Sequence, residues 1–359
     1  MADPSTLVTE TGGVLAAYRR QRLRRVMVVA GLAAACVVAF LLDLVTGPSS
    51  LTAAQVVGGL FNPDGLTPAQ AAIVWQVRLP YALMALMVGA ALSLAGAEMQ
   101  TILNNAMASP FTLGVSSAAS FGASLAIVLG LGLPFLGAGG AEWMIPLNAF
   151  LFAFGAMLLL QGVSRLRGAG SETLVLFGIA LVFAFNALTS LVQFLSSQEA
   201  LQQLVFWTMG SLSRSTWSSV GVLGVVVLLV TPFSFLAARA LTALRLGEDR
   251  ARSFGVDVDR LRFLSLLRIS LLSATAVAFV GAIGFIGLVG PHIARMLLGE
   301  DHRFLLPASL FTGALIMSLA SAASKTLVPG VLMPVGIVTA MVGAPVFLAL
   351  IFRNGIKRG

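Results

Sequence analysis

The sequence is poor in charge and in most reactive side chains. Only 10% of its 359 residues are charged, whereas an average soluble domain has about 25%. One cysteine, Cys36, excludes a disulfide within the chain and leaves the redox compartment open. The two histidines, His292 and His302, have no cysteine nearby, and a metal site usually needs three or four ligands. We therefore expect no metal site.

Lysine is also scarce, and this bears on ATP hydrolysis. A P-loop needs a Gly-Lys-Ser/Thr run, in which backbone amides and the lysine hold phosphates. Neither lysine fits, because Lys325 follows Ser324 and Lys357 follows Ile356. We expect no ATPase activity by this route and no cofactor in this chain.

Ionisable residues are sparse inside the long apolar segments. Proton- or ion-coupled carriers usually place such groups deep within their spans. Here the candidates all fall near predicted span ends: Asp43, Glu98, Arg268 and Lys325. Glu98 is expected to reach the inner interface. This pattern disfavours a transporter driven by ion coupling.

Apolar sequence is abundant, at 58% of the chain. Because a transmembrane helix needs roughly 20 mainly apolar residues, we predict an all-α integral membrane protein with about ten transmembrane helices. The predicted spans are 26–44, 80–103, 113–131, 146–164, 174–195, 219–238, 264–281, 283–298, 305–324 and 334–352. The boundary inside 264–298 stays open, because no polar gap separates its helices. No cleavable signal peptide is expected.

Basic residues set the predicted orientation, because Lys and Arg concentrate in cytoplasmic loops. With the N-terminus inside, all but four of the 22 basic residues fall on the cytoplasmic side, the exceptions being Arg78, Arg214, Arg268 and Lys325. We predict cytoplasmic N- and C-termini, a basic N-terminal segment 1–25, a single polytopic membrane domain 26–353 and a cytoplasmic tail 354–359. This distribution assigns the net charge of +8 to a membrane surface, and no nucleic-acid partner is expected.

The largest predicted cytoplasmic loop, 244–262, has the pattern of a short amphipathic element. Its charged and apolar residues lie close together: Glu248, Asp249, Arg250, Arg252 and Phe254. Gly255 can end a helical turn. The loop is either a solvated connector or a docking helix for a cytoplasmic partner, since fixed charges beside a small apolar patch suit a protein contact.

One predicted span, 174–195, has a polar stripe. Polar side chains recur there every three or four residues, at Asn186, Thr189, Ser190 and Gln193, which places them on one side of a helix. Because unpaired polar groups facing lipid are costly, the stripe should face protein or water. It supplies either interhelical hydrogen bonds or the lining of a solute path.

Regularly spaced glycines precede a sudden polar run in 281–307. Glycines at 281, 284, 287 and 290 form a slowly drifting groove, where another backbone can cross or the helix can break. Pro291 suits the first turn of a helix. We interpret the run around His292 and His302 as a helix turn at the inner membrane surface.

Several long blocks resemble a known family and occur in its order. They are "RLPYALMALMVGAALSLAGAEMQ", "LNNAMASPFTLGVSSAASFGA", "LGEDRARSFGV", "GAIGFIGLVGPHIARMLLGEDHRFLLP" and "LMPVGIVTAMVGAPVFLALI". From about residue 70 onward the chain resembles permease subunits of type II ABC importers for ferric siderophores, haem and cobalamin, the FecCD/BtuC-like family. The resemblance implies a BtuC-like ten-helix subunit in a homodimer or pseudosymmetric pair. It also implies two separate ATPase subunits, which carry ATP and Mg, and a periplasmic or lipid-anchored substrate-binding protein.

The resemblance also implies roles for particular segments. The translocation path would follow the subunit interface with the polar stripe in its wall, and loop 244–262 matches the region that couples to the ATPase. In similar permeases the loop after the second span carries Asn-Pro-Leu-Ala and helps form a cytoplasmic gate. Asn105 keeps the asparagine, while Ala106 and Met107 replace proline and leucine, so we expect a looser loop with Met107 as an adaptable plug. Ser171 and Glu172 match a second gate, although Glu172 departs from the usual small polar residue.

Two basic residues match positions that dock the binding protein in related permeases. Arg78 keeps the family's arginine, whereas Lys325 keeps only its charge, and Ser321 stands where aspartate is frequent. The resemblance therefore implies docking through Arg78 and Lys325. In the alternative, both side chains simply extend to the outer headgroups.

The sequence thus predicts a transport permease and not an enzyme. We expect a multi-pass subunit, in a bacterial inner (plasma) membrane, of an ATP-driven importer that moves an iron chelate such as a ferric siderophore into the cytoplasm. The alternatives are a haem or cobalamin permease of the same family, a stand-alone secondary transporter and a membrane scaffold without a transported solute.

Overall fold

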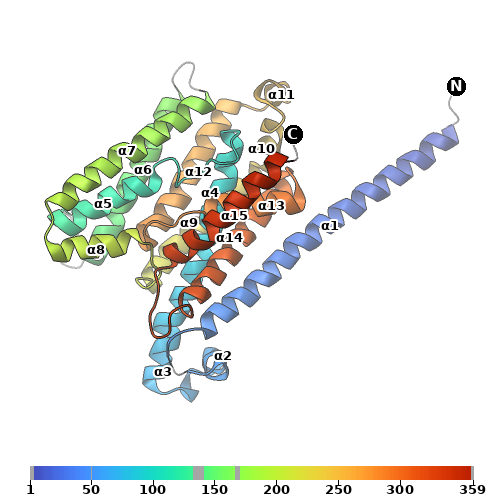
Figure 1. Cartoon of the computed structure of the whole chain (residues 1–359). Coiled ribbons are helices and arrows are strands. Elements are labelled where there is room, and N and C mark those ends of the chain that lie inside the picture. The colour runs from blue at the N-terminus through green and yellow to red at the C-terminus, as the bar shows by residue number, and fades with distance from the viewer. Residues whose placement is uncertain (1–3, 50, 132–140, 166–169, 357–359) are drawn as a thin grey trace.

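The protein is a bundle of α-helices in a computed structural model (Figure 1). The structure describes residues 4–49, 51–131, 141–165 and 170–356, with side chains described between residues 17 and 349. The long helices are α1 (Pro4–Val45), α4 (Leu79–Ile102), α5 (Val115–Leu129), α6 (Ala141–Ser164), α7 (Ser171–Phe194), α9 (Trp217–Leu236), α12 (Val258–Val280), α13 (Ile286–Leu298), α14 (His302–Ser324) and α15 (Val335–Ile356). Shorter helices are α2 (Ala53–Phe61), η1 (Pro63–Gly65), α3 (Pro68–Ala72), η2 (Ile73–Arg78), α8 (Gln198–Thr208), α10 (Ala238–Leu244) and α11 (Glu248–Ser253).

Each of the ten predicted spans coincides with one long helix. Within the described residues, seven helices are long and apolar enough to cross a membrane: Ala17–Val45, Pro68–Ile102, Glu142–Ser164, Ser171–Phe194, Trp217–Leu236, Val258–Val280 and His302–Ser324. The other three predicted spans form shorter apolar helices: Val115–Leu129, Ile286–Leu298 and Val335–Ala349. The prediction of an all-helical, multi-pass membrane protein is confirmed.

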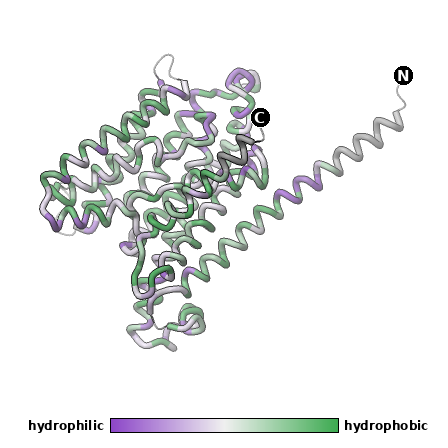
Figure 2. The backbone as a smooth tube through the Cα atoms, in the orientation of Figure 1, coloured by the Kyte–Doolittle hydropathy of each residue, from purple (hydrophilic) through white to green (hydrophobic). Residues whose placement is uncertain are grey.

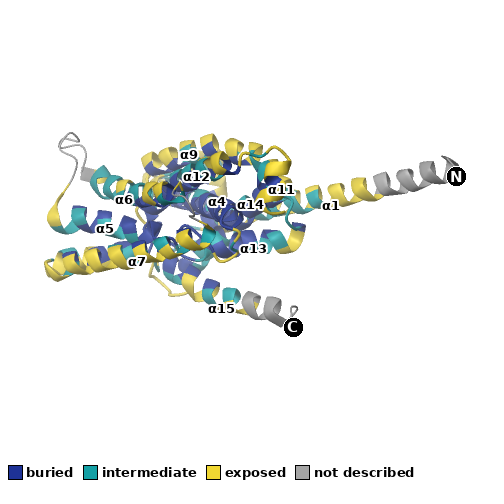
Figure 3. Ribbon diagram, turned by 90° about the horizontal axis from the view of Figure 1, so that it is seen from above, coloured by how far each residue is buried: buried dark blue, intermediate teal, exposed yellow. Residues whose placement is uncertain are grey.

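The centre of the bundle is formed by α4, packed against α12, α13 and α14 (Figure 3). Glycines allow backbones to touch there. A Cβ atom on Gly96 would lie 1.9 Å from the carbonyl oxygen of Gly287, and one on Gly89 would lie 2.3 Å from that of Gly313. Small residues permit this close approach in membranes, where packing rather than the hydrophobic effect drives helix association. The glycine groove predicted in 281–290 is therefore crossed by α4.

The same glycine run also ends a helix. α12 ends at Val280, and Gly281 has φ +80°, where a Cβ would lie 2.2 Å from the carbonyl oxygen of Trp207. Phe285, at φ +68°, then precedes α13. The open boundary in 264–298 thus falls at residues 281–285.

The predicted place of Pro291 in a first helical turn is wrong. Pro291 lies inside α13, which already begins at Ile286. Proline has no N–H to donate to the carbonyl four residues earlier, which is that of Gly287. The side-chain nitrogen of Gln100 lies 3.5 Å from that carbonyl oxygen and supplies a replacement donor.

Both chain ends point towards the end of the bundle that carries α10 and α11, which we call the α11 end (Figure 1). The first part of α1 extends away from the bundle on this side, and Figure 2 shows a hydrophilic band along it before the apolar span. The predicted N-terminal segment is therefore, from residue 4, a continuation of the first membrane helix. The opposite end carries α2 and α3, and we call it the α2 end. Arg167, Lys357 and Arg358 lie outside the described residues.

Candidate gate and coupling site

Three predicted gate residues line one hollow at the α11 end. The hollow has a volume of about 560 Å³. Its lining consists of Leu103, Asn104, Asn105, Ser171, Glu172, Val175 and Leu176. The loop after α4 thus faces the start of α7, so the two segments assigned to separate gates are brought together. Met107 lies in the same loop with its side chain exposed.

The gate loop, residues 103–114 between α4 and α5, begins with a tight turn. Asn104 has φ +45°, a conformation that asparagine tolerates better than most residues. The Asn105 side-chain oxygen accepts a hydrogen bond from the Met107 amide at 2.9 Å, and the Asn105 amide donates to the Gln100 carbonyl at 3.0 Å. Asparagine commonly closes turns in this way, so the turn is closed without a proline at position 106.

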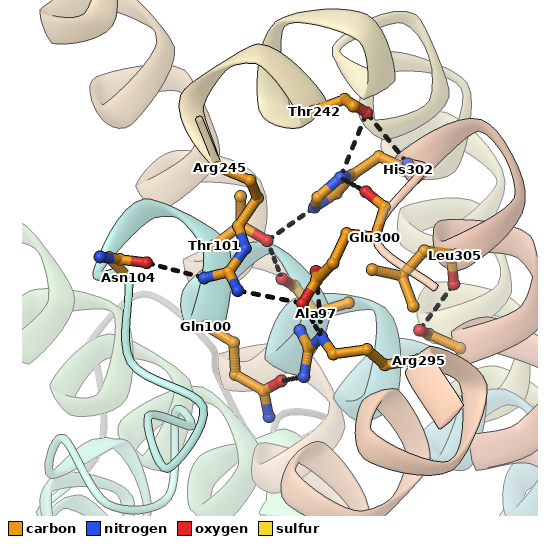
Figure 4. A network of polar contacts seen from close by, with 11 residues as sticks. Ala97, Gln100, Thr101, Asn104, Thr242, Arg245, Arg295, Glu300, His302 and Leu305 are labelled. Atoms are coloured by element: carbon orange, nitrogen blue, oxygen red, sulfur yellow. Dashed lines mark hydrogen bonds and ion pairs between the residues drawn. The ribbon is translucent and has the colours of Figure 1, made fainter. Parts of the chain in front are cut away.

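The last turn of α4 is held by side chains from α13 and α14 (Figure 4). Nη1 of Arg295 donates to the side-chain oxygen of Gln100 at 2.9 Å. Oγ1 of Thr101 lies 2.7 Å from Nε2 of the fully buried His302. These contacts explain the second histidine, since its ring is bonded to protein groups in a buried network.

Glu300 joins this network to the loop that precedes α11. Its carboxylate accepts from Nη2 of Arg245 at 3.0 Å and from Nε of Arg295 at 3.1 Å. Nη1 of Arg245 donates to the side-chain oxygen of Asn104 at 2.7 Å. One carboxylate between two guanidinium groups therefore links the gate loop to α10 and α13 (Figure 4).

Asp301, the next residue, caps α14 and ties α1 to the bundle. Its side chain accepts from the Arg303 amide at 3.2 Å, and its carboxylate forms ion pairs with Arg303 at 2.7 Å and Arg25 at 3.2 Å. The hydrogen bond from the Arg303 side chain, more than any other contact, holds the pKa of Asp301 below its ordinary value.

The amphipathic element predicted in 244–262 is the short helix α11. Gly255, at φ +79°, ends it as expected. Phe254 exposes 68% of its surface, and Asp249 and Arg250 are also exposed, without an ion pair among the described residues. This face is available to a partner.

Glu248 and Arg252 are engaged within the chain. The carboxylate of Glu248 contacts Nη2 of Arg262 on α12. Arg252 pairs with Asp259 at 3.4 Å on the surface. Coupling to an ATPase stays a prediction for both residues, and Glu248 already has a structural partner.

The polar stripe on α7 divides between two faces. Asn186 and Ser190 are exposed, and Gln193 is half-buried. Thr189 is buried and donates its hydroxyl to the carbonyl oxygen of Phe185 at 2.7 Å. Thr189 therefore faces protein, and its hydroxyl bonds its own helix rather than another one. A place of the four residues in the solute path stays a prediction.

Glu98 lies inside the bundle, about one turn before the end of α4. It is fully buried, and its carboxylate receives Nη2 of Arg268 at 2.6 Å and Nε at 3.1 Å. Arg268 also bonds the Ser265 hydroxyl at 2.8 Å. A partner 170 residues away therefore compensates the buried charge, and the expected position near the inner interface stays a prediction.

Arg78 and Lys325 both turn inward at the α2 end, around the last turn of α1. Nη1 of Arg78 donates to the Val45 carbonyl at 2.8 Å, and Nζ of Lys325 contacts the Asp43 carboxylate at 2.7 Å. Only 5% of Arg78 and 7% of Lys325 is exposed. Cations at the C-terminal end of a helix stabilise it by bonding its free carbonyls. Docking of a binding protein through these residues stays a prediction that must compete with these bonds.

No cluster of three or more His, Cys, Asp or Glu side chains suited to a metal ion occurs in the described part of the chain. The residues that the sequence analysis missed are instead polar groups around the gate loop: Gln100, Arg245, Arg262 and Glu300. Arg245 and Glu300 had counted only as charges, because Arg245 finds its partners 141 and 55 residues away. One sequence signal could have indicated this network: charged residues recur within or beside the sequence blocks that match the family at the α11 end.

Known proteins resemble the chain over most of its length. The model of the FecCD transport family matches residues 35–353. The ferric enterobactin permease FepD of Escherichia coli is 37% identical over 92% of this chain and 96% of its own. The molybdate permease MolB of Haemophilus influenzae is 36% identical over 82% of this chain and 84% of its own.

A solved structure has the same fold. It is an inward-facing conformation of a metal-chelate type ABC transporter, with a TM-score of 0.79 and 33% identity, and the match covers 91% of this chain and 99% of that one. Curated relatives include permeases for ferric chelates, hemin, vitamin B12 and molybdate. The chain therefore belongs to the FecCD transport family of ABC transporter permeases.

Proposed function

We propose that the chain is the membrane subunit of an ATP-driven importer that carries an iron chelate into the cytoplasm between two copies of itself. The main support is the hollow that joins Asn105, Ser171 and Glu172 at the α11 end. A loop and a helix start that face one another across an open space suit a gate. The relatives named for ferric enterobactin and Fe(3+) dicitrate support an iron chelate as cargo.

The exposed face of α7 supports the position of the path. Large apolar side chains lie on it, including Phe183 and Phe194 at 71% and 86% exposure. Asn186 and Ser190 lie on the same helix, and Ser171 at its start borders the gate hollow. The apolar side chains alone would fit lipid, but polar groups among them are costly against lipid, so this face suits contact with a second copy and a solute path along that contact.

The polar end supports the remaining partners. We place the α11 end in the cytoplasm of a bacterium, because most arginines lie there, with two ATPase subunits bound at Asp249, Arg250 and Phe254. Those subunits hold ATP and Mg, and this chain needs no cofactor. A periplasmic or lipid-anchored binding protein meets the α2 end, where docking by Arg78 and Lys325 requires both to leave their present bonds.

Uptake by the reconstituted complex tests the proposal. Proteoliposomes with the permease, its ATPase subunits and its binding protein would be offered ferric siderophores, haem, cobalamin and molybdate in parallel. We expect ATP-dependent, vanadate-sensitive accumulation of a ferric siderophore. Uptake of another compound instead would reassign the cargo, and exchange without ATPase subunits would point to a secondary transporter. In the active complex, Ser190→Phe should block uptake while the two copies still assemble.

A further inference from the structure

The helix α11 is connected to the gate loop by two arginines, one before it and one after it. Arg245 ends α10 and is separated from Glu248, the first residue of α11, only by Leu246 and Gly247. Arg262 lies in the first turns of α12, just after α11 in the chain. Both side chains turn towards the end of α4 rather than towards solvent, with exposures of 26% and 16%.

Arg262 attaches α11 to the fixed end of α4. Its Nη2 contacts the carboxylate of Glu248, and its Nε donates to the carbonyl oxygen of Ile102 at 3.3 Å. Ile102 is the last residue of α4, where carbonyls lack helical partners and attract a cation. Since α4 is held at the centre of the bundle by backbone contacts, this bond keeps α11 beside the end of α4.

Arg245 attaches the same region to the gate loop itself. Its Nη1 bonds the side chain of Asn104 at 2.7 Å, and its Nη2 bonds Glu300 at 3.0 Å. Asn104 immediately precedes Asn105, and both line the gate hollow. A planar guanidinium holds two acceptors in fixed directions, which a lysine cannot do.

The lengths of these bonds make the connection sensitive to small movements. Hydrogen bonds of 2.7–3.3 Å are lost when donor and acceptor separate by roughly another ångström. A movement of α11 that shifts Arg245 by that distance must therefore either carry Asn104 with it or release it. The positive φ of Asn104 makes the turn a place where the backbone can change between discrete conformations.

We propose that Arg245 is the positioning residue through which α11 moves the gate loop, with Arg262 anchoring α11 to the end of α4. This inference rests on the proposed function, because it assumes that an ATPase acts on α11. Asn104 is the residue of the gate loop on which Arg245 acts, and the bond to Glu300 defines the resting position of the Arg245 side chain. Neither arginine touches the transported solute.

The nucleotide response of the gate loop tests the proposal without knowledge of the cargo. In a Cys36→Ala background, Met107→Cys would be labelled with a water-soluble maleimide, in permease purified with its ATPase subunits in nanodiscs. Labelling rates would be compared between the nucleotide-free and vanadate-trapped states. We expect at least a fivefold change in rate for the otherwise unchanged protein.

The arginine variants are compared with a neighbouring arginine. Arg245→Gln should reduce the nucleotide response to below twofold while the ATPase subunits still co-purify. Arg262→Gln should reduce it as well. The matched control is Arg239→Gln. Arg239 lies on α10, whose C-cap is Arg245, and the two arginines border a second surface hollow that is distinct from the gate hollow. Arg239 forms no side-chain hydrogen bond or ion pair with the described residues, so this variant should respond like the parent.

Partner and rescue variants separate transmission from a merely structural role. Asn104→Ala should lose the response as fully as Arg245→Gln, and the double variant should lose no more than either alone. Arg245→Lys should restore part of the response, because its single ammonium can hold one acceptor well. If Arg245→Gln does not fold, Asn104→Ala alone shows whether the bond between these two residues transmits the nucleotide response.

Two results would overturn the inference, and they are distinguishable. An intact Arg245→Gln or Asn104→Ala complex with the full nucleotide response shows that α11 moves the gate by another route. Failure of the parent chain to bind any ATPase, or to respond to nucleotide at all, removes the proposed function and this inference together.

Discussion

α4 and α7 have the same length, 24 residues, but lie in opposite surroundings. Of the 24 residues in each helix, 20 are buried in α4 and five in α7. In the sequence, each of the two helices has the apolar composition of a membrane span. Figure 3 shows α4 in the middle of the bundle and α7 along its edge. Apolarity alone therefore does not determine which helix becomes the core.

The difference lies in residue size and in polar pairing. α4 has Gly89 and Gly96 at backbone contacts and the buried Glu98 paired with Arg268. α7 instead presents Phe183 and Phe194 to its surroundings. Since lipid is as apolar as a leucine side chain, burying large apolar residues gains little in a membrane, whereas close packing and hydrogen bonds gain more. Small and paired residues thus mark the centre.

Removing the charge partner of Glu98 in α4 should change the free energy of unfolding more than any other substitution considered for α4 and α7. Arg268→Met leaves a buried carboxylate unpaired and should lower the free energy of unfolding by about 3–5 kcal/mol. The double variant Glu98→Gln with Arg268→Met should recover most of this loss, and Glu172→Gln at the exposed start of α7 should change little. Unfolding in a detergent titration measures all three. Parent-like stability of Arg268→Met would mean that the pair does not define the core.

Adding one methyl group between α4 and α13 should cause the second-largest loss of stability. Gly96→Ala places a carbon where the Gly287 carbonyl oxygen now lies, and such overpacking typically costs about 1–3 kcal/mol. Gly155→Ala on α6 is the control, because a Cβ there meets no atom within 4 Å. Equal unfolding midpoints for the two variants would contradict the close approach of α4 and α13.

Cysteines introduced at two neighbouring positions of α7 compare a buried and an exposed face of one helix. In a Cys36→Ala background, Ser190→Cys should react with a water-soluble thiol reagent about tenfold faster than Thr189→Cys, because a buried thiol reacts only when the local structure opens. Labelling rates from mass spectrometry give the ratio. Similar rates would show that the two residues do not face opposite environments.

Truncating an exposed aromatic residue of α7 should have the smallest effect on the single chain. Phe183→Ala should change the free energy of unfolding by no more than about 0.5 kcal/mol. If α7 meets a second copy, the same variant should weaken the dimer, which size measurements in nanodiscs over a dilution series would detect. A large loss of stability in isolated monomers would place Phe183 inside the chain's own core.

The helices and the family were predictable from sequence, because both depend on local or linear patterns. Apolar runs located ten helices, seven of which are long and apolar enough to cross a membrane, and the quoted blocks identified the permease family. The charge pattern of 248–254 also located α11 and its glycine end. Each of these signals lies within one continuous stretch of residues.

The roles of single polar residues were less predictable, because their partners are distant in the chain. Glu98 was expected near the inner interface from its position along its span, and docking by Arg78 and Lys325 was implied by the family resemblance. The structure gives the three residues partners 170, 33 and 282 residues away, which no local pattern indicates. The different exposures of Thr189 and Ser190 were also not predictable, since a spacing of three or four residues does not say which residue lies at the edge of a helix face.

The backbone contacts of α4 also determine where the molecule can bend. Gly96 contacts Gly287, and Gly89 contacts Gly313, backbone to backbone. At these two points no side chain separates the helices, so none can absorb a displacement by changing its rotamer. These three helices therefore form a stiff frame with few internal degrees of freedom. Segments attached to that frame are therefore better placed to move during a transport cycle than the frame itself. One of them is the 12-residue gate loop from Leu103 to Gly114, which joins α4 to α5 and packs against Gly178 of α7. A stiff centre thus leaves conformational freedom to the loops at the ends of the bundle.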